Sequence, residues 1–292
     1  MLASYKYNLY GITAILLWAC LVGMFRNVTE QLGPIGGAAL VYTCSSLFLM
    51  LSLGIPKLRQ FSKSYIVVCG ALFAAYEVCF SLALGFASDR LQTVEIAIVN
   101  YLWPSLTVLL AVFAGSKKVS LWVYPAILLA FFGVTWSIIG DEGLSLSRLI
   151  ANVSSNPLAY LLAFAGAIIW AVYCNLTRRM SNGQNGITLF FIFTALSLWI
   201  QFFVTDTKLP DLNWSVAFDV ALTSIFMGSG YALWNVAIIG GNMLFLATLS
   251  YFTPILSTFF SIIILGITVS GTFWQGVIMV TVGSLICWRV TK

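Results

Sequence analysis

Histidine is absent from all 292 residues of the chain. Histidine is the commonest metal ligand, the usual general base and the side chain that changes charge near neutral pH, so another residue type would have to fill each of these roles. The six cysteines do not offer a metal site instead, because they are scattered through the apolar segments without C-x-x-C spacing. We therefore expect no bound metal and no cofactor.

Charged residues are also scarce. Only 8% of the residues are charged and 61% are hydrophobic, whereas about a quarter of the residues in soluble domains are charged. The apolar residues come in ten blocks, each about long enough to cross roughly 30 Å of hydrocarbon as a helix. The blocks are 8–25, 35–54, 65–86, 91–114, 121–139, 157–177, 187–205, 216–238, 244–265 and 271–289. Strand-like alternation is missing, so the sequence predicts an all-α polytopic membrane protein.

Two missing motifs narrow the function. The ten blocks leave no room for a soluble nucleotide-binding domain, and the Gly-x4-Gly-Lys-Ser/Thr phosphate loop does not occur. The G-x-S-x-G nucleophile elbow is missing as well. The sequence therefore argues against ATP-driven transport and against an intramembrane enzyme. It favours a secondary transporter, with a passive channel as a weaker alternative.

The few charges that are present indicate the orientation. Lysine and arginine concentrate in cytoplasmic loops, and one set of loops here is purely basic. Its cations are Lys6, Lys57, Arg59, Lys63, Lys117, Lys118, Arg178, Arg179, Arg289 and Lys292. The other set contains Arg26, Arg90, Arg148 and Lys208 beside Glu30, Asp89, Asp141, Glu142, Asp206, Asp211 and Asp219. We expect both termini in the cytoplasm, and we see no patch for nucleic acid.

Two of the seven prolines indicate an internal duplication. Pro104 and Pro254 each interrupt a long apolar block, in the matching settings Y-L-W-P and Y-F-T-P. At the same offset, Gly133 matches Gly283. Each half holds five blocks, and five is an odd number, so the second half must enter the membrane from the opposite side. This predicts two inverted five-helix repeats, an arrangement typical of secondary transporters.

The repeats define the expected domains. We assign residues 1–145 to the first five-helix repeat, 146–156 to an external linker and 157–292 to the second repeat. The linker has apolar residues at Leu146, Leu149, Ile150 and Val153, which is consistent either with a short interfacial helix or with an ordinary connector.

These features together resemble a known group of transporters. Ten spans in about 290 residues, a 5+5 repeat, the tryptophans Trp18 and Trp170 early in each half, and the two prolines are similar to the drug/metabolite transporter superfamily. Within it, the chain resembles EamA-type members that export aromatic and other amino acids from bacteria. The resemblance implies a bacterial inner-membrane exporter with a basket of helices around a central cavity. Lysine and arginine are essentially absent from the span interiors, which argues against phosphorylated cargo.

Glu77 and Glu95 are the ionisable residues that lie well within the blocks. A charged group in the membrane is costly and usually faces a cavity or a partner, so both are candidate functional residues. Either carboxylate could bind the ammonium of a substrate or carry a proton. Glu95 lies nearer a block end, where contact with headgroup water or pairing with Arg90 is the alternative.

Aromatic residues surround these carboxylates in the sequence. Tryptophans near block ends, such as Trp122 and Trp214, fit the aromatic belts of the membrane interface. Deeper tryptophans need a partner or a wet cavity for the indole N–H. By resemblance to the exporters, we expect the substrate site to contain Trp18, Tyr76, Glu77, Asn100, Tyr101, Trp103 and Trp170.

The two prolines are the expected hinges. A proline within a helix frees the carbonyl four residues earlier, so the Asn100 and Ser250 carbonyls are predicted to be available to water or substrate. The leading hypothesis is an exporter of amino acids or similar small metabolites that works by alternating access. A drug or quaternary-ammonium exporter with Glu77 as the cation site is the alternative. The expected partners are a small-molecule substrate and membrane lipid, without an obligate protein partner.

Overall fold

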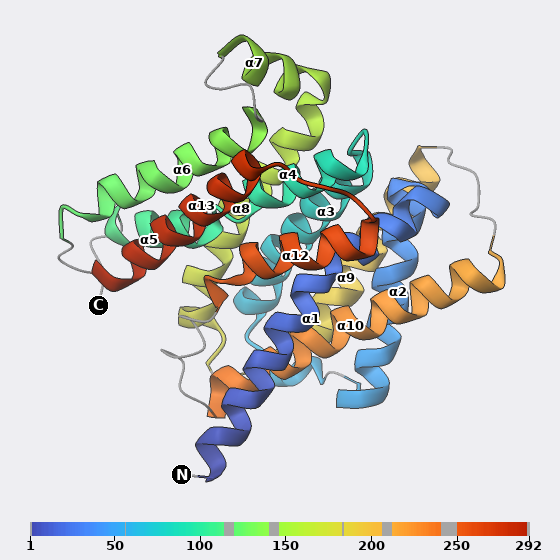
Figure 1. Cartoon of the computed structure of the whole chain (residues 1–292). Helices are drawn as coiled ribbons and strands as arrows, with labels where there is room; N and C mark the ends of the chain where they lie inside the picture. Colours follow the sequence, from blue (N-terminus) through green and yellow to red (C-terminus); the bar gives the residue numbers. More distant parts are fainter. Residues whose placement is uncertain are drawn as a thin grey trace.

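A computed structural model describes residues 2–55, 57–113, 120–139, 146–182, 184–205, 212–240 and 250–290. Within these ranges all regular structure is helical, and no strand occurs. Figure 1 shows the helices packed side by side in one bundle, with α7 (Leu146–Ser155) at the top and the start of α1 at the bottom. The α-helical class predicted from composition is confirmed for the described residues.

The helices have the following bounds. They are α1 (Leu2–Leu32), α2 (Pro34–Leu53), α3 (Gly70–Phe86, preceded by the π-helix Tyr65–Cys69), α4 (Arg90–Asn100), α5 (Trp103–Phe113), α6 (Val123–Ile139), α7 (Leu146–Ser155), α8 (Pro157–Met180), α9 (Ile187–Val204), α10 (Trp214–Gly240), α12 (Thr253–Leu265) and α13 (Gly271–Val290). Six segments, in α1, α2, α3 with its π-helix, α8, α9 and α10, are long and apolar enough to cross a membrane. Apolar helices in α6, α12 and α13 are shorter. The chain is therefore a polytopic membrane protein.

Short polar caps and glycines explain several helix ends. Gly33, with φ of 77°, separates α1 from α2, which begins with Pro34. The Asp89 side chain accepts the Gln92 N–H and begins α4, as expected for an N-cap residue. At the other end of the chain, α12 stops at Gly266, whose φ of 64° lies in the left-handed region that glycine adopts without strain.

The two prolines break helices instead of bending them. Helix α4 ends at Asn100, and α5 begins two residues later at Trp103, so Pro104 is the second residue of a new helix. The same two-residue turn precedes α12, where Pro254 again follows the first residue. Proline is tolerated at a helix start because the N–H it lacks would be unpaired there. The prediction of a continuous kinked span over 91–114 was therefore wrong.

One of the two freed carbonyls already accepts a hydrogen bond. The Thr253 hydroxyl donates to the Ser250 carbonyl at 2.6 Å. This bond takes one of the two lone pairs of the carbonyl oxygen, so its availability to water or substrate stays a prediction. The first half differs, because its matching residue is Trp103, which has no hydroxyl to donate.

Packing follows a small set of helix pairs. Helix α1 lies against α10 and α12, α8 lies against α3, α4 and α5, α2 against α9, and α6 against α13. The α6–α13 pair is packed backbone to backbone: a Cβ added to Gly133 would lie 2.7 Å from the Gly276 carbonyl oxygen, and one added to Gly283 would lie 2.6 Å from the Ala126 carbonyl oxygen. Small residues permit this close approach of two helices.

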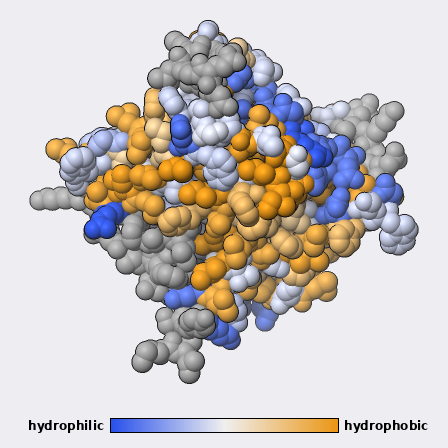
Figure 2. Space-filling model, in the orientation of Figure 1, coloured by the Kyte–Doolittle hydropathy of each residue, from blue (hydrophilic) through white to orange (hydrophobic). Residues whose placement is uncertain are grey.

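The surface is suited to hydrocarbon. Figure 2 shows apolar residues across the middle of this face, with hydrophilic residues mostly toward its edges. Trp214 is 93% exposed and Leu51 is 88% exposed, which would be unfavourable in water but is ordinary for lipid-facing or interfacial positions.

The linker residues form helix α7, as one of the two interpretations predicted. The Asn152 amide of α7 donates to the Ile138 carbonyl at the end of α6, at 2.7 Å.

Candidate functional site

Glu77 lies in the interior of the bundle, in the middle of α3. It is only 3% exposed. Its two carboxylate oxygens accept hydrogen bonds from the hydroxyls of Tyr42 on α2 and Tyr231 on α10. The carboxylate therefore joins three helices, and no lysine or arginine of the described residues forms an ion pair with it. A buried carboxylate held only by neutral donors keeps its attraction for a cation.

A set of contacting aromatic rings reaches this carboxylate through Tyr231. We call them the ring cluster, and its members are Trp18, Phe73, Tyr76, Trp103, Trp170, Tyr173, Phe190, Phe191, Tyr231 and Trp234. Phe73 lies at its centre, with ring centroids 5.7 Å from Tyr231 and 6.1 Å from Trp170. The Tyr76 and Trp170 rings are 4.5 Å apart, and Trp103 meets Trp170 edge-on at 6.4 Å.

Trp18 forms the other side of the ring cluster. Its ring lies 5.1 Å from both Tyr231 and Trp234. It fits against α10 because Gly230 has no side chain: a Cβ there would lie 2.8 Å from the indole. The indole N–H is buried and has no acceptor among the described residues. A buried donor of this kind is costly unless water or a ligand accepts from it.

Asn100 lies beside the cluster at the end of α4, and it is 1% exposed. Its amide nitrogen donates to the Ala163 carbonyl of α8 at 3.3 Å, and its amide oxygen lies 3.5 Å from the Tyr76 hydroxyl. The next residue, Tyr101, is buried in the turn between α4 and α5. Of the expected site residues, the structure thus brings Trp18, Tyr76, Glu77, Asn100, Trp103 and Trp170 into linked contacts, and it places Tyr101 directly beside Asn100.

Glu95 has a different setting. It is half-buried, and its carboxylate accepts the hydroxyl of Tyr160 on α8 at 2.6 Å. The alternative in which Glu95 pairs with Arg90 is not found, because Arg90 binds Glu30 instead. The two intramembrane glutamates therefore have separate tyrosine partners.

A charged network lies where α1 and α12 end and α4 begins. We call Arg26, Glu30 and Arg90 the ionic clamp. Arg26 is 7% exposed and binds Glu30 at 2.9 Å and the Ala87 carbonyl at 2.7 Å. Arg90 binds the second oxygen of Glu30 at 2.8 Å and the Leu265 carbonyl at 2.7 Å. The hydrogen bond to Glu30 also raises the pKa of Arg90.

Sequence reasoning missed the clamp and one tyrosine. Arg26 and Arg90 were treated as loop charges, and the interpretation did not pair either of them with Glu30. Tyr42 was not singled out, although its place near the middle of a span is a usable signal: a buried carboxylate on one helix requires donors from its neighbours.

Comparison with known proteins identifies the family. The model of the EamA-like transporter family matches residues 157–289. The aromatic amino acid exporter YddG of Salmonella typhimurium (strain 14028s / SGSC 2262) is 43% identical over 291 residues, which cover 100% of this chain and 99% of the exporter. The chain belongs to the EamA-like transporter family.

Other relatives agree with this membership. The aromatic amino acid exporter YddG of Escherichia coli (strain K12) is 44% identical over 289 residues, or 98% of each chain. A protein crystal structure with 24% identity matches with a TM-score of 0.67 over 98% of both chains, so the two share a fold. Because the EamA-like chain is a transporter, the interpretation that it is not an enzyme is confirmed.

Proposed function

We propose that this protein exports aromatic and other apolar amino acids across the bacterial inner membrane, and that the substrate binds in the ring cluster beside Glu77. The observation that carries the proposal is the Glu77 carboxylate, which is buried, free of an ion-pair partner among the described residues, and bounded by aromatic rings. Full-length similarity to two exporters of aromatic amino acids supports the substrate class.

Each part of such a substrate has a matching group. The ammonium is attracted to the Glu77 carboxylate and to the ring faces by cation–π interaction. The apolar or aromatic side chain packs on Trp170, Tyr76 and Trp103, where ring pairs are favourable. The buried Trp18 N–H, which lacks an acceptor among the described residues, is a donor for the substrate carboxylate. Asn100 and Tyr101 complete the proposed site, and Glu95 is proposed as a second proton-binding position.

We also propose that the ten spans form two inverted repeats, residues 1–145 and 157–292. The packing supports this. If the halves correspond, α1 matches α8, α3 matches α10, and α4 with α5 matches the segment that ends in α12. Exchanging the two halves then turns the contacts of α1 with α10 and α12 into contacts of α8 with α3 and α5, and all four contacts are present. The α2–α9 and α6–α13 pairs map onto themselves, as expected for pairs that lie on a two-fold axis. The family model covers 157–289, which is nearly the whole second repeat.

Alternating access is proposed to use the two helix breaks as hinges. Short helices that meet at a break can change their angle without disrupting hydrogen bonds within either helix. Pro104 and Pro254 fix the positions at which α5 and α12 begin.

We place both termini in the cytoplasm because the exposed cations Lys57, Arg59 and Lys63 follow α2, opposite the end of α1 that holds the ionic clamp.

Counterflow in proteoliposomes tests the proposed function. Vesicles containing the purified protein and unlabelled phenylalanine are diluted into labelled phenylalanine, with and without a pH gradient. We expect transient accumulation of label that unlabelled tryptophan or tyrosine abolishes. Accumulation that follows the pH gradient would support proton coupling through a glutamate. No accumulation of any aromatic or apolar amino acid would contradict the proposal.

A carboxylate among rings also fits a lipophilic cation, which keeps the alternative substrate class in view. In the same vesicles, a quaternary ammonium compound is tested as a competitor and as a labelled substrate. We expect it to compete weakly and not to accumulate, because it lacks the carboxylate that Trp18 would bind. Accumulation of the cation without accumulation of phenylalanine would favour a drug exporter.

A further inference from the structure

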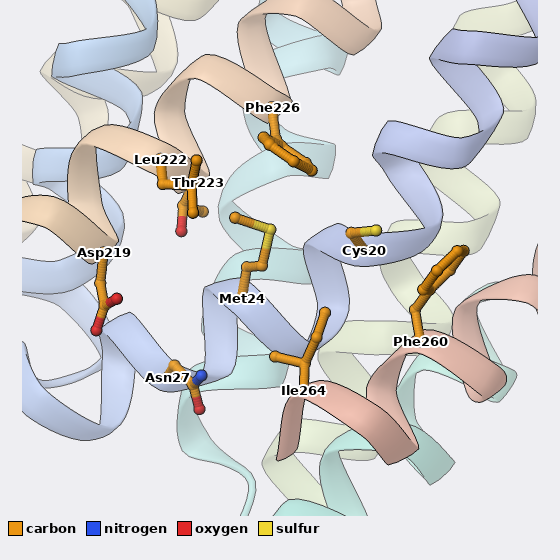
Figure 3. Close-up of a pocket in the computed structure, with 9 residues that line it drawn as sticks. All are labelled: Cys20, Met24, Asn27, Asp219, Leu222, Thr223, Phe226, Phe260 and Ile264. Carbon is orange, nitrogen blue, oxygen red and sulfur yellow. The ribbon is translucent and has the colours of Figure 1, made fainter. Parts of the chain in front are cut away.

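A groove of about 350 Å³ opens between α1, α10 and α12. Figure 3 shows side chains from these three helices pointing into a shared space, with Asn27 and Asp219 at one end and Cys20 and Phe260 at the other. Apart from Thr223, the rest of the lining is apolar and includes Met24 and Phe226. The groove thus has one polar end and one apolar end.

The groove is separate from the ring cluster. Cys20, Met24 and Asn27 recur at the spacing of one helix face. At about 3.6 residues per turn, Trp18 lies roughly half a turn away from that face. Since Trp18 contacts Tyr231 and Trp234 inside the bundle, the groove faces outward, toward the membrane. Nothing in the proposed transport step uses it.

The polar end lies close to the membrane interface. Asn27 precedes the end of α1 at Leu32 by five residues, and Asp219 follows the start of α10 at Trp214 by five residues. At a rise of about 1.5 Å per residue, both are roughly 8 Å along the axis from their helix ends. Trp214 is 93% exposed, as expected for an interfacial anchor. The apolar end therefore points toward the bilayer centre.

Asp219 is the charged residue of the groove lining. Its Oδ2 accepts the amide N–H of Gln31 at 2.9 Å, and the same amide nitrogen donates to the Asn27 carbonyl at 3.0 Å. These bonds hold the carboxylate at the groove without neutralising it. The nearby cations Arg26 and Arg90 are bound to Glu30 in the ionic clamp. A carboxylate can accept several further hydrogen bonds, so its position favours a ligand with N–H donors and a positive charge.

We infer that the groove is a binding site for a phospholipid whose headgroup carries a primary ammonium, phosphatidylethanolamine. Its ammonium lies at Asp219 and donates hydrogen bonds to the carboxylate. One acyl chain extends past Met24 and Phe226 to Phe260. There it supplies the van der Waals contacts that the side chains of an empty groove lack. A trimethylated choline headgroup carries the same charge but has no N–H to donate. An anionic glycerol headgroup is repelled by the carboxylate.

Native mass spectrometry of the full chain tests this inference. The protein is released from nanodiscs that contain equal amounts of phosphatidylethanolamine, phosphatidylcholine and phosphatidylglycerol, and the retained lipids are counted. We expect phosphatidylethanolamine to be retained about threefold more than phosphatidylcholine, because its N–H groups donate to the Asp219 carboxylate in addition to carrying the same charge. Equal retention of the three lipids would overturn the proposal.

Two variants locate the retained lipid. Asp219→Asn keeps an oxygen acceptor for Gln31 but removes the charge, and we expect it to abolish the preference for phosphatidylethanolamine. Cys20→Trp fills the apolar end and should reduce total lipid retention. Ile225→Trp adds the same indole at a 45% exposed position of α10 outside the groove lining, and it should retain lipid as the unaltered chain does. An unchanged preference in Asp219→Asn, or a dimer cross-linked through the groove by a cysteine-reactive linker at Cys20, would contradict a lipid site.

Discussion

At the scale of single residues, Glu77 is the centre of the proposed site. Two tyrosine hydroxyls orient its carboxylate, and no lysine or arginine of the described residues forms an ion pair with it. A charged hydrogen bond inside a protein contributes about 1.5–3 kcal/mol, which corresponds to an expected loss of affinity of at least about tenfold for an analogue without the ammonium. The aromatic rings then supply apolar contact without further charge.

The tyrosines make separable contributions. Tyr42→Phe removes one donor to Glu77 and keeps the ring that packs 5.5 Å from Phe191. We expect the KM for phenylalanine to rise about threefold to tenfold, because one neutral hydrogen bond contributes about 0.5–1.5 kcal/mol. Uptake kinetics in proteoliposomes measure this. The control is Tyr65→Phe, whose hydroxyl donates to the Gln184 carbonyl and not to Glu77. An equal change in KM in this control would show that the effect is not specific.

The ionic clamp makes its prediction at the residue scale as well. Arg26 is nearly buried and binds both Glu30 and the carbonyls that end α3. Arg26→Ala leaves Glu30 with one cation and several carbonyls without donors, so we expect a loss of stability of about 3 kcal/mol. The melting temperature in detergent measures it. Exposed Arg59→Ala is the control. Equal melting temperatures of the two variants would refute a structural role for the clamp.

At the scale of helices, the sequence predicted some features and missed others. The repeat of Pro104 and Pro254 marked two interruptions of the helical pattern, and each proline is the second residue of a helix, because proline has a strong local effect that needs no tertiary information. It did not reveal that the helix ends at Asn100 and restarts at Trp103. Similarly, the cost of charge in a membrane singled out Glu77, whereas Tyr42 and the clamp depend on contacts between helices that periodicity does not encode.

The helix breaks can be tested directly. Alanine at position 104 or 254 would allow α4 to continue into α5, or the preceding turn into α12, since the N–H becomes available. We expect Pro104→Ala and Pro254→Ala to fold normally, with transport reduced about tenfold or more if the break is the hinge. Pro157→Ala, at the first turn of α8, is the matched control and should transport normally. Full transport by both hinge variants would contradict the hinge proposal.

At the scale of the whole molecule, the α6–α13 pair and the α1–α12 pair differ in their packing and in their expected roles. The α6–α13 pair, with Gly133 against Gly276, is too close for either helix to move freely. The α1–α12 contact lies between the ring cluster and the lipid-facing groove, and the ionic clamp holds α1 and α12 together at one end. The proposed alternating-access cycle would therefore combine the closely packed α6–α13 pair, two broken helices and one charged contact that joins them.

The central claim is that Glu77 binds the amino acid ammonium within the ring cluster. Phenylalanine counterflow by Glu77→Gln, beside Glu77→Asp and the unaltered chain at matched amounts of folded protein, tests it most directly. Glutamine keeps acceptors for the tyrosines but not the charge, so we predict that exchange falls at least about tenfold. Aspartate should retain more of the exchange than glutamine does. Exchange by Glu77→Gln at the rate of the unaltered chain would contradict the account.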